Sequence, residues 1–152
     1  MHKTTDRLIK NLERTRDEVV RYFALGDAEL ARTYAPGKWS VRYLLHHLAD
    51  SELVLGERLR RVISEPGFVI WYFDQDLWEK ALDYSTRSLS TAKAVFEVMR
   101  NANIELARRH YEKDGAREFV HSRAGVRTLR EEFEQVAEHT EHHLEQVRQA
   151  LR

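Results

Sequence analysis

The sequence predicts an all-α protein, a four-helix bundle with a long crossover between its second and third helices. Four separate segments carry apolar residues at three- and four-residue steps, which is the helical period. Capping residues, glycine or proline bound these segments, and an irregular aromatic-rich stretch separates the second from the third. The 152 residues suffice for one buried core, so we expect residues 1–152 to form a single domain.

The first helix is expected to run from a cap at Thr5 or Asp6 to near Gly26, with one apolar stripe. The second is expected from Val41 to about Ile63, again with a single apolar stripe. A serine that can cap this second helix precedes it and a Pro-Gly pair closes it: Ser40 and Pro66-Gly67.

Residues 66–90 are the least regular segment and hold most of the aromatic side chains. The apolar run 68–73 is too short for its periodicity to distinguish a strand from a buried helix. We interpret the segment as a long crossover. Its aromatic residues, Trp71 and Trp78 especially, either line a pocket or pack into the core or a dimer surface.

The third helix is expected to start after a cap at Ser88 or Ser90 and to end by Gly115. Weak alternation in residues 117–127 predicts a loop or a weak hairpin. Residues 128–131 then have the spacing of a capping box, so the fourth helix begins there and runs to the C-terminus.

Composition excludes several classes of function. The 25 basic residues balance the 25 acidic ones and are interleaved with them, so we expect no nucleic-acid partner. The absence of cysteine means that a transition-metal site must use His, Asp or Glu. The polar first residues lack a signal peptide's apolar stretch and no run approaches the ~18 apolar residues of a membrane span, so we expect a cytoplasmic protein without a membrane partner.

The fourth helix carries three of the 8 histidines within five residues. With ~100° per residue and Thr140 as the middle of the apolar stripe, His143 lies about 60° and His139 about 100° to the same side. His142 falls on the solvent face. His139 and His143 are therefore the pair that can share a metal ion.

The second helix offers a third ligand. Relative to Leu48 in its apolar stripe, His47 lies about 100° to one side and His46 about 160° away, which predicts that His46 is a surface residue. If His47 faces His139 and His143, three imidazoles meet and leave one coordination position open.

A carboxylate on the second helix also faces the protein core. Glu52 lies about 40° from the middle of the stripe, so it is either a general base or an orienting partner of a histidine, or it forms an ion pair with an arginine of another helix. Ser51 either faces the pocket or packs as a small residue, and Asn103 is either a polar pocket wall or a buried amide bonded to another helix. We expect His121 near the pocket mouth.

Residues 38–41, 47–52 and 139–147 together resemble the signature segments of the DinB-like (damage-inducible) superfamily. The resemblance covers nearly the whole chain in order and spacing. It implies a four-helix bundle, often a homodimer, in which His47, His139 and His143 hold a divalent metal beside a pocket. Members of this superfamily include transferases and isomerases that use a metal to activate a low-molecular-weight thiol.

Three interpretations follow for the function. In the first two, three histidines hold a divalent metal, zinc first and nickel, iron or manganese as alternatives. This metal supports either hydrolysis of a small-molecule substrate or transfer to a low-molecular-weight thiol. The third is a non-catalytic bundle, a stress-related or dimeric scaffold, whose metal stabilises the fold and takes a fourth protein ligand such as Glu52.

Overall fold

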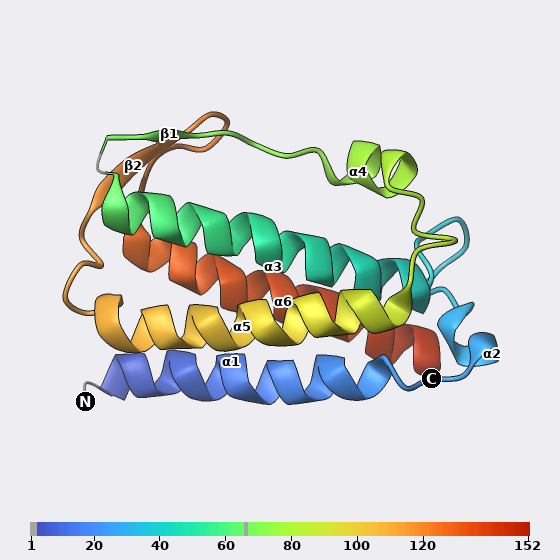
Figure 1. The fold of residues 1–152 in the computed structure, drawn as a ribbon. Helices are drawn as coiled ribbons and strands as arrows, with labels where there is room; N and C mark the ends of the chain where they lie inside the picture. The colour runs from blue at the N-terminus through green and yellow to red at the C-terminus, as the bar shows by residue number, and fades with distance from the viewer. Residues whose placement is uncertain (1–2, 66) are drawn as a thin grey trace.

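The structure is a computed structural model that describes residues 3–65 and 67–152, and these residues form six helices and three short strands. The long helices lie side by side as a bundle (Figure 1), so the predicted fold class is confirmed. They are α1 (Lys3–Tyr22), α3 (Val41–Ser64), α5 (Leu89–His110) and α6 (Leu129–Leu151). The short helix α2 (Asp27–Leu30) lies in the connection between α1 and α3.

The direction of the helices explains the crossover. Helices α1 and α6 run one way along the bundle, whereas the packed neighbours α3 and α5 both run the other way (Figure 1). A parallel pair of helices cannot be joined by a tight turn, so the chain after α3 returns along the whole bundle before α5 begins. This returning segment contains β1 (Val69–Ile70) and α4 (Gln75–Ala81).

A small sheet covers one end of the bundle. Strand β2 (Glu118–His121) pairs in parallel with β1 and antiparallel with β3 (Gly125–Thr128). Of the two possibilities for residues 117–127, the structure therefore contains the hairpin. Only the first part of the apolar run 68–73 is a strand, and it is held there because β2 supplies a pairing edge.

Most of the predicted helix starts are present. The Ser40 side chain accepts a hydrogen bond from the Tyr43 N–H, and Ser88, not Ser90, caps α5 through the Thr91 N–H. The reciprocal capping box of Thr128 and Glu131 starts α6.

The predicted limits of the first helix are wrong at both ends. The helix already includes Lys3, so Thr5 and Asp6 lie inside it, and the Thr5 hydroxyl donates to Glu112 Oε1 at 2.9 Å instead of capping. The helix ends at Tyr22, before Gly26. Pro66, the predicted terminator of the second helix, lies outside the described residues.

A buried polar layer crosses the centre of the bundle. Arg100 of α5 is 0% exposed and donates to both carboxylate oxygens of Glu52 on α3, from Nε at 2.9 Å and from Nη2 at 2.7 Å. It also donates to the hydroxyls of Thr15 on α1 and Thr140 on α6. Asn103 adds a donor to Glu52 at 2.8 Å. Each of the four long helices thus contributes a side chain to one network.

This layer divides the hydrophobic core into two clusters. On every long helix, residues before and after the layer belong to different clusters. Representative members of one cluster are Leu12, Leu55, Leu59, Ile104 and Phe133, and of the other Val19, Leu44, Leu48, Phe96 and Leu144.

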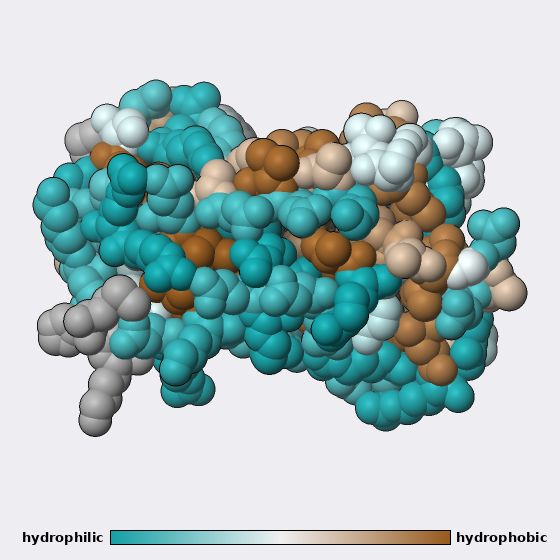
Figure 2. All heavy atoms as spheres, turned by 60° about the horizontal axis from the view of Figure 1, so that its bottom comes forward, coloured by the Kyte–Doolittle hydropathy of each residue, from teal (hydrophilic) through white to brown (hydrophobic). Residues whose placement is uncertain are grey.

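The face of the molecule in Figure 2 is mostly hydrophilic. Hydrophobic side chains reach this face only in separate patches. None of the helices in the described part of the chain combines the length and the apolar character that a bilayer crossing needs.

Replacing Arg100 with methionine is expected to lower the free energy of unfolding by about 3–5 kcal/mol, because it leaves the Glu52 carboxylate buried without its cation. Urea denaturation measures this change. The matched control is Arg108→Met, which breaks the exposed ion pair with Glu13 and should cost less than about 1 kcal/mol. Equal effects of the two substitutions would contradict the role of the buried layer.

Candidate metal centre

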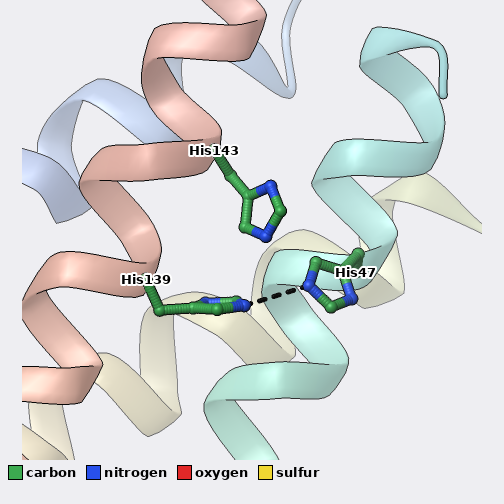
Figure 3. A group of neighbouring side chains, drawn as sticks. All are labelled: His47, His139 and His143. Atoms are coloured by element: carbon green, nitrogen blue, oxygen red, sulfur yellow. Dashed lines mark hydrogen bonds between the residues drawn. The ribbon is translucent and has the colours of Figure 1, made fainter. Parts of the chain in front are cut away.

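Three histidines from two helices point toward one another (Figure 3). His47 comes from α3, and His139 and His143 come from successive turns of α6. One ring nitrogen from each histidine lies within 4.8 Å of the other two. The Nε2 atoms of His47 and His139 are 3.0 Å apart, close to the ~3.3 Å between neighbouring ligand atoms that metal–nitrogen bonds of 2.0–2.1 Å give in a tetrahedral site.

The environment keeps these imidazoles neutral. Burial lowers the pKa of His47 to about 3 and the pKa of His143 to about 4. The pKa of His139 is also well below its usual value, because of burial first and then the neighbouring histidines and Arg100. A neutral imidazole has the free electron pair that a metal ion requires, so the three rings are in the ligating form at neutral pH.

Contacts around the rings fix their orientation. His143 Nδ1 is 2.7 Å from Gln146 Oε1, so Nδ1 carries the proton and Nε2 keeps the free electron pair. The ring of His47 contacts the rings of Trp39, with centroids 5.1 Å apart, and Phe73, with centroids 6.4 Å apart. The donor set, its burial and its protonation therefore fit a divalent transition metal.

Two clefts reach this cluster, and each is lined by a different one of its histidines. The first, which we call the His139 cleft, has a volume of about 250 Å³ and is lined by residues that include Ser51, Phe73, Arg127, Glu132 and His139. The second, the His143 cleft, has a volume of about 360 Å³ and is lined by residues that include Lys38, Trp39, Asp76, His143 and Gln146. Gln75 of α4 lines both clefts.

Comparison with known proteins agrees with the histidine pattern. Residues 11–147 match the model of the DinB superfamily. The chain belongs to the DinB superfamily. Solved four-helix structures of this kind include YfiT from Bacillus subtilis, described as a probable metal-dependent hydrolase with an unusual four-helix bundle topology. It superposes with a TM-score of 0.88 over 99% of this chain and 87% of that one at 24% identity, which shows a shared fold.

Several curated relatives bear names that describe candidate metal-dependent hydrolases. OB0413 of Oceanobacillus iheyensis is 31% identical over 128 residues, which is 84% of this chain and 73% of the relative. BH0277 of Halalkalibacterium halodurans is 27% identical over 136 residues, 84% of this chain and 74% of the relative.

The remaining candidate residues lie in different surroundings: some belong to the buried polar layer and others line the His139 cleft. Glu52 is bound by Arg100 and Asn103, so the interhelical ion pair that was one of the alternatives for Glu52 is present, and Asn103 is the buried interhelical amide. Ser51 Oγ lies 3.3 Å from His47 Nε2 and lines the His139 cleft. His121 lines the same cleft.

His142 is exposed, as predicted, but the prediction that His46 is a surface residue is wrong. His46 is 0% exposed, because Tyr84 from the segment after α4 stacks on it with centroids 5.4 Å apart. Burial lowers the pKa of His46 to about 4. The azimuth of His46 was measured from a single apolar stripe, whereas the crossover gives α3 a second covered face.

Sequence reasoning missed the charged residues of the His139 cleft. Glu132 precedes His139 by seven residues, which places the two about 20° apart around α6. The same azimuth comparison would therefore have found Glu132. Arg127 and Gln75 carried no such signal, because they lie on the hairpin and on the crossover.

The metal-free protein is expected to lose stability as the pH falls below about 6.5. The unfolded chain protonates its histidines near pH 6.5, whereas His46, His47 and His143 stay neutral in the folded state until about pH 4 or below. The contribution of these three histidines to stability is therefore flat above pH 6.5 and falls by about 1 kcal/mol per histidine per pH unit below it.

Urea denaturation in chelator at pH 7.5 and pH 5 measures this slope. His46→Phe should make the slope shallower, and the exposed His142→Ala should leave it unchanged. Equal stability of the wild type at the two pH values would refute the burial of neutral histidines.

Proposed function

We propose that this protein is a divalent-metal-dependent hydrolase of a small molecule, with His47, His139 and His143 as the metal ligands. The observation that supports this most is the convergence of three neutral imidazoles beside two clefts. A divalent metal held by three imidazoles acts as a Lewis acid and lowers the pKa of a water or thiol in the open position. The names of the curated relatives agree with hydrolysis.

The chain's own residues supply orientation and shielding. Gln146 holds the ring of His143, and Trp39 and Phe73 cover the ring of His47 against water. Within the described residues the ligand group contains no carboxylate, and Glu52 is fully engaged by Arg100 and Asn103. This disfavours the non-catalytic scaffold, which would close the coordination sphere with Glu52.

Transfer to a low-molecular-weight thiol is the second candidate. The observation that favours it is the pair of clefts, since a transferase brings two molecules to one centre and a hydrolase needs only one besides water. Addition of a small thiol to the cobalt-loaded protein distinguishes the two, because a thiolate ligand adds a sulfur-to-cobalt charge-transfer band. A spectrum that does not respond to the thiol favours hydrolysis.

Zinc is the first choice of metal because nitrogen-rich sites of low coordination number suit it, with nickel, iron and manganese as alternatives. The homodimer, the small-molecule substrate and the cytoplasmic location stay predictions.

Metal analysis tests the ligand assignment. Protein prepared without a histidine tag should hold about one equivalent of divalent metal, and His143→Ala should weaken metal affinity by more than about 100-fold. The matched control is His142→Ala, which removes the adjacent exposed imidazole and should leave the affinity unchanged. A wild type without stoichiometric metal, or a His143→Ala variant that retains it, would sink the assignment.

A further inference from the structure

The His139 cleft contains a buried carboxylate that the protein leaves partly unpaired. Glu132 is 2% exposed, and its Oε1 atom is buried without a hydrogen-bond partner among the described residues. The nearest cation is Arg58, whose Nη1 lies 3.6 Å from Oε1, beyond normal hydrogen-bond length. Arg58 is held in place by donating from Nη2 to the Trp71 carbonyl at 3.0 Å.

Burial of this carboxyl has an electrostatic consequence. Loss of solvent raises the pKa of Glu132, and Arg58 and Arg127 oppose that rise. An unpaired buried carboxylate oxygen costs free energy unless a donor reaches it. The cleft therefore favours a molecule that brings an N–H or O–H group to Glu132.

The same cleft contains an unsatisfied cation. The Nε atom of Arg127 is buried and has no hydrogen-bond partner in the described part of the chain. Its nearest acidic neighbour is Glu131, with Nε 3.9 Å from Oε2. That oxygen already accepts from the N–H and the hydroxyl of Thr128. Arg127 also donates from Nη2 to the Glu131 carbonyl at 3.3 Å, so Nε keeps bonding capacity for an anion.

His121 adds a neutral donor to the cleft. Its Nδ1 atom lies 3.2 Å from the N–H groups of both Arg123 and Ala124, so Nδ1 accepts and Nε2 carries the proton. Burial, with the positive charges of Arg58 and Arg127, lowers the pKa of His121 and favours this neutral form.

We propose that the His139 cleft binds an amino acid or hydroxy acid with an apolar side chain, with its carboxylate on Arg127 and His121 and its adjacent ammonium or hydroxyl group on Glu132. Leu55 and Phe73 give the cleft an apolar wall for the rest of the molecule. The binding itself stands on the cleft residues alone, and only the assignment of this molecule as substrate rests on the proposed hydrolase. His139 lines the same cleft, so a molecule bound there lies beside the candidate metal ligands.

Three probes that share a phenyl stem test the proposal in the full chain, both metal-free and zinc-loaded. They are L-phenylalanine, 3-phenylpropionate, which lacks the ammonium group, and 2-phenylethylamine, which lacks the carboxylate. Two-dimensional NMR titration should show that phenylalanine binds at least about tenfold more tightly than either partner probe. Shifted resonances should belong to residues of the His139 cleft.

Substitutions separate the two halves of the recognition. Glu132→Gln should weaken phenylalanine binding about tenfold without weakening phenylpropionate. Arg127→Gln should weaken both acids about tenfold and leave 2-phenylethylamine unchanged. Glu138→Gln, an exposed substitution on the same helix, is the matched control and should change none of the three.

Several outcomes would contradict the proposed ligand site. Equal binding of phenylalanine and phenylpropionate, no binding of phenylalanine, or binding that survives both substitutions would overturn the proposal, with ordered water as the occupant of the cleft. If Glu132→Gln does not fold, the partly exposed Arg127 and the wild-type probe ranking still test it. Selective phenylalanine binding by a wild type that takes up no divalent metal when it is supplied would refute the hydrolase and leave the ligand site standing.

Discussion

The pairing of Glu52 with Arg100 is the interaction on which the rest of the bundle depends. Both groups are fully buried, so each needs the other and further hydrogen-bond partners. Those further partners come from α1, α5 and α6, so with Glu52 on α3 the network links all four long helices and fixes their rotation and axial position. Thr140 binds Arg100, and His139 is the next residue back along α6. The polar layer thereby sets the direction in which His139 points toward His47.

The crossover gives the candidate metal centre its burial. Because α3 and α5 run in parallel, the connecting segment must pass along the bundle, and it passes over the side of α3 that carries the histidines. Phe73 from this segment covers His47, and Tyr84 covers His46. Burial in turn depresses the pKa of both rings and keeps them neutral. The parallel arrangement of α3 and α5 therefore requires the crossover, and the crossover keeps His46 and His47 neutral.

The sequence predicted what depends on a single helix. Periodicity located four helices, the caps at Ser40 and Thr128 were readable, and azimuths selected the three histidines that the structure brings together. It failed where a distant segment decides the environment. The burial of His46 depends on Tyr84, which comes from a segment far along the chain, so the azimuth of His46 on its own helix could not predict it. The cleft residue Arg127 is positioned by a hairpin, and its place depends on strand pairing that helical periodicity does not show.

Two buried carboxylates show how one physical rule separates structural from functional side chains. Glu52 receives three hydrogen bonds from Arg100 and Asn103, so any change of partner would cost the energy of that network. Glu132 is as deeply buried, yet one of its oxygens receives none from the described residues, and its cation stands 3.6 Å away. The first carboxylate holds the helices in position, since all its partners are internal. The second has bonding capacity left for a molecule that enters the cleft beside His139, and bonding gained there contributes directly to binding.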